Sequence, residues 1–197
     1  MTRQARLHPE ALKNLFIESG AWLQGHFLLS SGLHSDQYLQ CALLLADPPQ
    51  AEMLGAALSR LCDQRPDVVL SPALGGLIIG HEAARALKAK AYFSERENGV
   101  MTLRRGFSLN PGQKVIIVED VITTGKSSQE AIDLAQSFGA EVTAALSIIN
   151  RSAAPLNLGI AVKSLMKINI PTFAPENCPL CREAKPLVKP GSRKIPC

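Results

Sequence analysis

The sequence predicts an α/β protein whose central, mostly parallel sheet is flanked by helices. Helix-like and strand-like patterns alternate from residue 48 to residue 150, as they do in proteins with helices on both faces of a parallel sheet. The β-branched run after Lys114 contains no polar residue before Glu119, which indicates a strand buried on both faces. A chain of 197 residues, 46% of them apolar, fits a single domain spanning 1–197.

Local patterns place the first elements in chain order. Apolar residues at helical spacing predict a helix over 8–19, and residues 25–41 alternate as two short strands with a turn between them. A second helix begins at Asp47-Pro48-Pro49, where proline suits the first turn. A strand over 68–70 and a helix over 76–88 follow.

The second half of the chain repeats this alternation. We expect a strand over 91–93, the buried strand that begins at Lys114 and ends in Glu119-Asp120, a helix that Gly139 ends, and a strand over 141–150. Each strand is followed by a helix or a loop long enough to return the chain to the same edge of the sheet, as parallel pairing requires.

Three segments lie outside the alternation. The polar stretch 94–105 contains Asn98-Gly99, a strong turn signal that we interpret as a mobile loop. Residues from 1 to about 45 and from 171 to 197 are expected to form a small hood over the strand ends, where open α/β sheets bind ligands.

Two adjacent carboxylates, Glu119 and Asp120, follow the buried strand, and a turn rich in Thr, Gly and Ser separates them from the next helix. Backbone N–H groups in such a turn, together with the positive end of the helix dipole, favour an anion such as phosphate. A P-loop would need a glycine five positions before Gly125, where Asp120 stands, so that class of nucleotide site is excluded. Carboxylates that only cap the helix are the alternative, but two acids beside a Thr-Thr-Gly turn exceed what capping requires.

A second glycine-containing turn, Ala73-Leu74-Gly75-Gly76, follows the strand over 68–70. Glycines at the start of a helix let backbone amides approach an anion closely. Junctions of this kind are common, so the turn alone indicates little. Its place one β–α–β unit before the Glu119-Asp120 turn makes it a candidate second anion site.

Several motifs together resemble those of the orotate phosphoribosyltransferases, a family of type I phosphoribosyltransferases, over nearly the whole chain. Glu119-Asp120 with Thr123-Thr124-Gly125 is similar to the signature with which the wider family binds phosphoribosyl diphosphate (PRPP). The narrower resemblance rests on the segments 27–32, 35–38, 93–96, 103–107, 118–121, 178–181 and 189–193.

The resemblance implies the type I phosphoribosyltransferase fold and the transfer of ribose 5-phosphate from PRPP to a ring nitrogen of orotate. The products would be orotidine 5′-monophosphate and pyrophosphate, on the route to UMP. The resemblance also implies Mg²⁺, bound mainly through PRPP and water rather than by protein ligands. Members of the family act as homodimers, so the loop 94–105 is expected to reach the site of the neighbouring subunit.

The same resemblance assigns roles to individual residues. Glu119 and Asp120 would align the ribose and stabilise positive charge at its anomeric carbon, and Arg104 and Arg105 of the loop are further catalytic candidates. Arg151 would bind the carboxylate of orotate. The remaining PRPP contacts would be Arg96, Ala73, Leu74, Gly75, Gly76, Val121, Ile122, Thr123, Thr124, Gly125, Lys126 and Ser127, and the base pocket would include Ser31, Tyr38, Leu39 and Thr123.

The chain departs from the family pattern at several points. Many members carry lysines where this sequence has Ser30 and Gly75, and also in the loop, whereas residues 91–113 contain none here. The arginines of a short loop must then supply the positive charge. Lys126 stands where glycine is more common, and it either contacts phosphate or points to solvent.

Composition excludes several classes of protein. The net charge of +4 is concentrated after Cys181, where five basic residues accompany Glu183 as the single acid, so we expect no nucleic-acid-binding face. No segment approaches the ~20 apolar residues of a membrane span, and the N-terminus lacks the apolar core of a signal peptide. We therefore expect a cytoplasmic protein with small-molecule substrates and no membrane partner.

Five cysteines, at positions 41, 62, 178, 181 and 197, do not suggest a disulfide framework. Cys178 and Cys181 form a CxxC pair, which is typical of zinc or redox sites, but a structural zinc site needs four ligands. The other cysteines and the four histidines have no matching spacing. A buried or reducible pair is therefore favoured over a metal site.

Three functions stay open from the sequence. Besides an orotate enzyme, the chain could be a phosphoribosyltransferase for another base, or a PRPP- or nucleotide-sensing regulator without catalysis. Arg151 favours an acidic pyrimidine, and Glu119-Asp120 with an arginine-rich loop argues against a regulator. An ordinary solvated side chain is the alternative for each arginine, and a core position is the alternative for Tyr38 and Leu39.

Overall fold

The computed structural model describes residues 7–29 and 31–190. Its main sheet contains six strands, namely β3 (Val68–Pro72), β4 (Lys90–Glu97), β5 (Val100–Leu103), β6 (Lys114–Ile122), β7 (Glu141–Asn150) and β8 (Ala161–Lys167). Their order is β5-β4-β3-β6-β7-β8, with β4 and β5 antiparallel and the other four neighbouring pairs parallel. The predicted α/β class with a mostly parallel sheet is confirmed.

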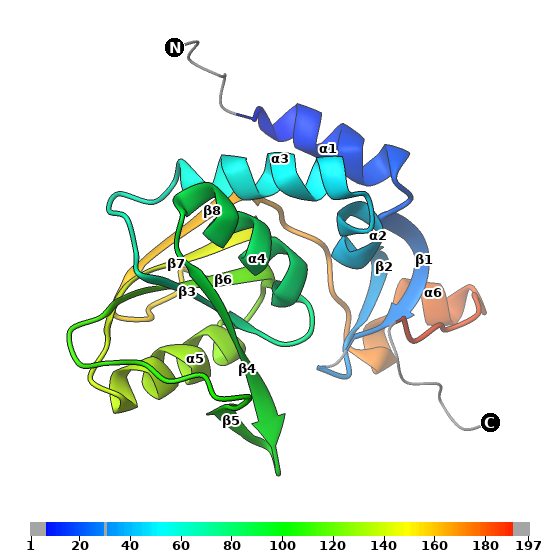
Figure 1. The fold of residues 1–197 in the computed structure, drawn as a ribbon. Helices are drawn as coiled ribbons and strands as arrows, with labels where there is room; N and C mark the ends of the chain where they lie inside the picture. The colour runs from blue at the N-terminus through cyan, green and yellow to red at the C-terminus, as the bar shows by residue number, and fades with distance from the viewer. Residues whose placement is uncertain (1–6, 30, 191–197) are drawn as a thin grey trace.

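Helices cover both faces of this sheet (Figure 1). Side chains of α1 (Pro9–Glu18), α2 (Cys41–Leu45), α3 (Pro48–Ser59) and α4 (Gly76–Leu87) pack into the hydrophobic cluster on one face. Helix α5 (Lys126–Ser137) packs on the other face. No helix within the described residues is both long and apolar enough to cross a membrane.

Strand β6 lies at the centre of the sheet, between β3 and β7. Ile116 and Val118 belong to the cluster beneath α3 and α4, whereas Val115 and Ile117 belong to the cluster beneath α5. All four side chains are fully buried. The uninterrupted apolar run therefore belongs to a strand that is buried on both faces. The polar residues of this strand lie before and after the run.

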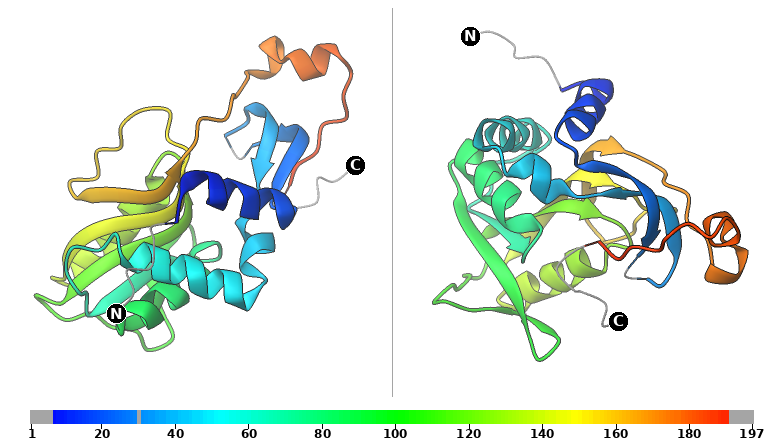
Figure 2. Two further views of the ribbon diagram at one scale, coloured as in Figure 1. Left: turned by 90° about the horizontal axis from the view of Figure 1, so that it is seen from above. Right: turned by 90° about the vertical axis from the view of Figure 1, so that its right-hand side faces the viewer.

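A second, two-stranded sheet of β1 (Trp22–Leu28) and β2 (His34–Leu39) stands beside the main sheet. The C-terminal segment, with the 3-10 turn η1 (Pro175–Asn177) and the short helix α6 (Pro179–Arg182), runs along this hairpin (Figure 2). Backbone hydrogen bonds join this segment to the β1–β2 hairpin. The N–H groups of His34 and Phe173 each donate to the other residue's carbonyl at 2.8 Å, and Val188 pairs with β1. Ser30, Arg193, Lys194 and Cys197, which the sequence singled out, lie outside the described residues.

The segment 94–105 differs from the expected open loop. Strand β4 continues to Glu97, Asn98 and Gly99 form the turn with φ of 51° and 85°, and β5 returns antiparallel to β4. Positive φ at both central residues is what a type I′ hairpin turn needs, and Asn-Gly supplies it at low cost. The segment is thus a β-hairpin that projects from the edge of the sheet (Figure 1).

Candidate active site

The two carboxylates of the signature lie at the carboxyl end of β6, where both are half-buried. Ser128 Oγ donates a short hydrogen bond to Glu119 Oε1, and the N–H of Val121 donates to Asp120 Oδ1 at 2.9 Å. Burial raises the pKa of Glu119 to about 7, against the hydrogen bond from Ser128, which lowers it. Burial also raises the pKa of Asp120, whereas the hydrogen bond from the N–H of Val121 lowers it. Both acids are therefore poised to be stabilised by positive charge brought into the site.

The turn between β6 and α5 forms a small cradle. Gly125 takes the left-handed conformation, with φ of 76°, and precedes the first residue of α5. Glu119 and residues 121–127 surround a hollow of about 50 Å³ there. The first N–H groups of a helix have no partner within the helix and point towards such a hollow. Its size and its donors suit a phosphate group, as the sequence predicted.

The second glycine turn lies directly against the first. A side-chain carbon at Gly75 would stand 2.6 Å from Asp120 Oδ1, so only glycine allows this approach. Leu74 in the same turn is 78% exposed. Strands β3 and β6 are neighbours in the sheet, and their carboxyl ends therefore bring the two predicted anion turns together.

A cleft of about 460 Å³ opens beside the cradle. Its lining includes every residue that the sequence assigned to the base, namely Ser31, Tyr38, Leu39, Thr123 and Arg151. Asp120, Val121 and Thr124 of the signature also line it. The walls come from the β1–β2 hairpin, from the signature turn and from the chain just after β7 and β8. A single cavity thus joins the predicted ribose acid to the predicted base residues.

Arg151 is the positive group of the cleft. Its backbone N–H donates to the carbonyl of Ile122 at 2.8 Å, which ties it to the end of β6. Its side-chain Nε is buried and has no hydrogen-bond partner among the described residues. Burial lowers the pKa of Arg151, while Tyr38 and then Cys41 oppose the shift. A guanidinium stays charged in proteins, so an acidic ligand here would satisfy both its charge and its donor.

The three arginines of the β4–β5 hairpin, Arg96, Arg104 and Arg105, line neither the cleft nor the cradle. Arg105 forms a two-pronged ion pair with Glu95, at 2.7 and 2.8 Å, and Arg104 lies 3.5 Å from Glu97. Arg96 donates to the carbonyl of Gly99 at 2.9 Å and makes a short ion pair with Glu130 of α5. The structure therefore assembles the acids, the turns and the base residues, but it leaves the three arginines paired on the hairpin.

Sequence analysis missed several residues of the site. Ser128, which holds Glu119, stands in the first turn of α5 and had no distinguishing pattern. Part of the remaining wall lies just after β8, a strand that was not predicted. Had β8 been predicted, the polar residues beyond its carboxyl end would have indicated a binding site there. The lining residues that follow β8 are Asn169, Ile170, Pro171 and Thr172, and the other unassigned lining residues are Leu29 after β1, Gln40 after β2 and Ala153 after β7.

Comparison with known proteins identifies the family. Residues 45–175 match the family model described as "Phosphoribosyl transferase domain". The chain is 54% identical over 186 residues to the orotate phosphoribosyltransferase of Carboxydothermus hydrogenoformans, which covers 93% of this chain and 97% of that protein. The chain belongs to the orotate phosphoribosyltransferase family.

Solved structures place the fold within the same family. The crystal structure of orotate phosphoribosyltransferase from Aeropyrum pernix matches with a TM-score of 0.68 and 27% identity, over 80% of this chain and 93% of that one. An adenine phosphoribosyltransferase from Leishmania donovani matches with a TM-score of 0.61 and 16% identity, over 80% of each chain. Phosphoribosyltransferases named for a pyrimidine and for a purine therefore share this fold.

Glu119→Gln should change how thermal stability depends on pH. The pKa of folded Glu119 is about 7, against an ordinary 4.5, so folding favours the protonated carboxyl. That contribution is fully present below about pH 4.5 and is lost as the pH rises through about 7. The melting temperature of the wild type should therefore fall relative to that of Glu119→Gln across this window, as followed by circular dichroism without ligands.

Two further variants serve as controls for this measurement. Ser128→Ala removes the hydrogen bond that favours the ionised carboxylate, so the window should move to higher pH. Glu141→Gln changes an exposed acid at the start of β7 and should follow the wild-type curve. Wild-type and Glu119→Gln curves that run parallel from pH 4 to 8 would contradict the raised pKa.

Proposed function

We propose that this protein is an orotate phosphoribosyltransferase, which joins ribose 5-phosphate from PRPP to a ring nitrogen of orotate and releases pyrophosphate in the synthesis of UMP. The single cleft that contains both Asp120 and Arg151 carries the proposal, because it joins a ribose-phosphate site to a site for an acidic base. Near-full-length relatives named as orotate phosphoribosyltransferases support the choice of base.

We propose that the two acids act on the ribose. The nitrogen of orotate forms a bond to the anomeric carbon while the bond from that carbon to the pyrophosphate oxygen breaks, so positive charge develops on the ribose. Glu119 and Asp120 accept hydrogen bonds from the ribose hydroxyls and stabilise this charge. Their partial burial strengthens the effect, because charges interact more strongly where water is excluded.

The 5′-phosphate fits the cradle between β6 and α5. Backbone N–H groups of residues 123–127 and the hydroxyls of Thr123, Thr124 and Ser127 supply donors around the small hollow. Lys126 is exposed at its rim and adds positive charge. The second turn, beside Asp120, is proposed to hold the pyrophosphate group, because Gly75 lets its backbone approach the anomeric carbon closely.

The hairpin arginines are proposed to close over the pyrophosphate. Their ion pairs with Glu95, Glu97 and Glu130 lie at the surface, with arginine side chains 41–60% exposed. Exposed pairs of this kind contribute only about 0–1 kcal/mol, so exchanging them for phosphate contacts costs little. Asn98-Gly99 gives the hairpin a tight tip, and we propose that this tip reaches the neighbouring subunit of a homodimer.

Mg²⁺ is the proposed cofactor. The oxygen atoms that meet at the cleft, on Glu119, Asp120, Thr123 and Thr124, are of the kind that a hard cation prefers. The ion would be bound mainly by PRPP and water, with the acids beside it, and would neutralise charge on the leaving pyrophosphate. A cytoplasmic location is proposed as well, and the free thiols of Cys41, Cys62, Cys178 and Cys181 suit a reducing compartment.

Arg151→Ala tests the proposed base. Hydrogen bonds to charged groups contribute about 1.5–3 kcal/mol, which corresponds to a roughly 10- to 100-fold change at about 1.4 kcal/mol per decade. We expect kcat/KM for orotate to fall by at least this range while the KM for PRPP changes little. The measurement follows the loss of orotate absorbance with PRPP and Mg²⁺.

Two comparisons make this assay specific. Arg65→Ala, which removes an exposed arginine far from the cleft, should leave the kinetics unchanged. Uracil, which differs from orotate by lacking the carboxylate, should be a very poor substrate of the wild type and of the variant. Preference of the wild type for uracil or a purine, or normal use of orotate by Arg151→Ala, would overturn the orotate assignment.

Asp120→Asn tests the ribose site. The substitution keeps the shape of the side chain but removes a charge directed at the developing cation, so kcat should fall by roughly 10²-fold or more. Binding of PRPP, measured by calorimetry, should weaken less than kcat. Asp133→Asn, on the exposed side of α5, is the matched control. Near-normal turnover in Asp120→Asn would remove the acid from the mechanism.

Mixing two inactive variants tests the shared site. A protomer with Asp120→Asn keeps its hairpin, and a protomer with Arg104→Ala and Arg105→Ala keeps its acids. Random pairing makes about half of the dimers mixed, and each mixed dimer regains one complete site if the hairpin serves its neighbour, so about a quarter of wild-type activity should return. Mixed dimers that form, as shown by native mass spectrometry, but stay inactive would mean that each hairpin serves its own subunit.

A further inference from the structure

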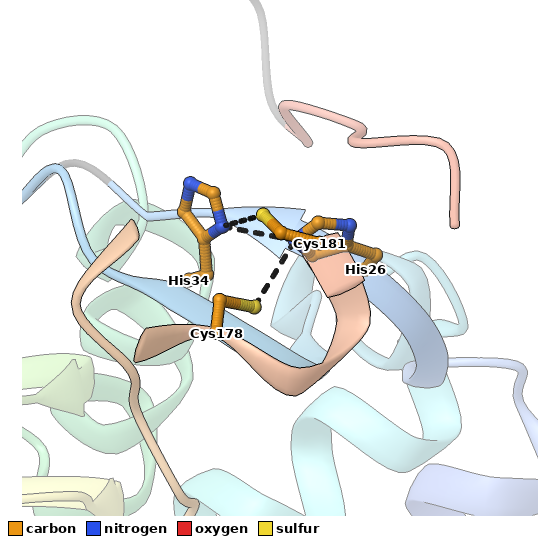
Figure 3. A group of neighbouring side chains, drawn as sticks. All are labelled: His26, His34, Cys178 and Cys181. Carbon is orange, nitrogen blue, oxygen red and sulfur yellow. Dashed lines mark hydrogen bonds between the residues drawn. The ribbon is translucent and has the colours of Figure 1, made fainter. Parts of the chain in front are cut away.

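Four side chains of metal-binding type meet at the β1–β2 hairpin, away from the cleft. His26 comes from β1, His34 from β2, and Cys178 and Cys181 from the two ends of the CxxC motif at α6 (Figure 3). Their four ligand atoms all lie within 4.8 Å of one another. Spacing along the chain assigned no histidine to this cysteine pair and favoured a buried or reducible pair over a metal site, whereas the fold places two histidines beside it.

We propose that these four side chains form a structural zinc site. Zinc bonds of about 2.3 Å to sulfur and about 2.0 Å to nitrogen, at tetrahedral angles, place neighbouring ligand atoms about 3.3–3.8 Å apart. In the structure, Nε2 of His26 lies 3.5 Å from Cys178 Sγ and 3.7 Å from Cys181 Sγ. Nδ1 of His34 lies 3.3 Å from Cys181 Sγ and 2.9 Å from Nε2 of His26. These four separations differ from the corresponding edges of a tetrahedron by only a few tenths of an ångström, and the two remaining pairs, Cys178 with Cys181 and Cys178 with His34, lie within 4.8 Å.

His26 is oriented for metal binding by a second contact. Its Nδ1 lies 2.9 Å from the carbonyl oxygen of Lys185. A carbonyl can only accept, so Nδ1 carries the proton and, in the neutral ring, the lone pair of Nε2 points into the cluster. A ring nitrogen fixed in this way by a backbone carbonyl is the usual partner contact of a zinc-bound histidine.

Three of the four side chains are buried, and the fourth, Cys181, is exposed at the surface. His26 and His34 are only 3% and 5% exposed, and Cys178 is 1% exposed. The two thiols and two imidazoles converge, so several sulfur and nitrogen lone pairs point to one place. Hydrogen bonds among the four groups use only some of these lone pairs. Two nitrogen and two sulfur ligands in a tetrahedral arrangement favour zinc among common metals. On binding, the two thiols release their protons to solvent and bind as thiolates.

The position of the cluster indicates a structural role. Four protein ligands close the coordination shell, which leaves no open position for catalysis. The ion would link the two strands of the hairpin to α6, a helix of only four residues that is too short to be stable alone. None of the four residues lines the cleft of about 460 Å³. The proposal therefore stands independently of the proposed transferase activity.

Metal analysis of the full-length protein tests the proposal. The chain is purified without a histidine tag, in reducing buffer with added zinc, and gel-filtered before elemental analysis. We expect about one zinc ion per chain, and roughly tenfold less in Cys178→Ser and in Cys181→Ser. Cys62→Ser, at a half-buried cysteine elsewhere, and His81→Asn, at an exposed histidine on α4, should keep the full zinc content.

Cobalt replacement makes the test independent of how well the cysteine variants fold. The wild-type protein is stripped with a chelator and titrated with Co²⁺. Visible absorption bands of tetrahedral cobalt with thiolate ligands should rise linearly and stop at one equivalent, and saturating zinc should raise the melting temperature of the stripped protein.

Two results would overturn the proposal. One is a wild-type protein that retains no zinc and gives no tetrahedral cobalt spectrum under reducing conditions. The other is zinc retention that is equal in the wild type and in the Cys178→Ser and Cys181→Ser variants. A Cys178–Cys181 disulfide found by mass spectrometry in protein that binds no metal would make the pair a redox couple instead.

Discussion

Burial of β6 on both faces is the constraint on which the site depends. A polar side chain between Val115 and Val118 would lose its water without gaining a partner, which is why the acids stand only where the strand ends. At that end, Ser128 and the N–H of Val121 satisfy them in part. The same position removes enough water to raise the pKa of both carboxyls. The sheet therefore sets the chemistry of the acids as well as their place, because partly buried carboxyls with raised pKa values respond strongly to positive charge brought near them.

Positive charge is divided between the half-buried Arg151 of the cleft and three exposed arginines of the β4–β5 hairpin. Arg151 is held at the end of β7, half-buried and tied to β6 through its backbone, so it can recognise a carboxylate at a constant distance from Asp120. Arg96, Arg104 and Arg105 are exposed on a two-stranded extension and are paired with acids that hold them weakly. A cation held in one place suits recognition of an acidic ligand, whereas exposed cations in weak ion pairs can exchange their partners at little cost.

The sequence predicted the parts of the fold that depend on local pattern. The buried run after Lys114, the glycine turns and the helix before Gly139 carry their signals within a few residues, and the structure has a strand, two turns and a helix at these places. Strand β8 was not predicted because it is a half-exposed edge strand. Its residues mix Lys163 and Ser164 with apolar neighbours, so the sequence shows neither an apolar run nor a clear alternation. The base pocket was found through family resemblance, since its residues lie on separate segments. Nothing in the spacing of Cys178 and Cys181 could point to His26 and His34, because about 150 residues separate them and only the tertiary fold brings them together.

The β1–β2 hairpin and the C-terminal segment together form a small assembly that buries few large apolar side chains, among them Phe27, Leu39 and Leu180. Leu187 and Val188 are 41% and 51% exposed, and the backbone bridges to β1 and β2 are few. Small units of this kind rarely bury enough surface to offset the entropy of ordering the chain, and a metal ion is a common remedy. The same segments supply one wall of the base cleft through Ser31, Tyr38 and Thr172. A cross-link at His26, His34, Cys178 and Cys181 would therefore hold that wall of the cleft in place from the side away from the cavity.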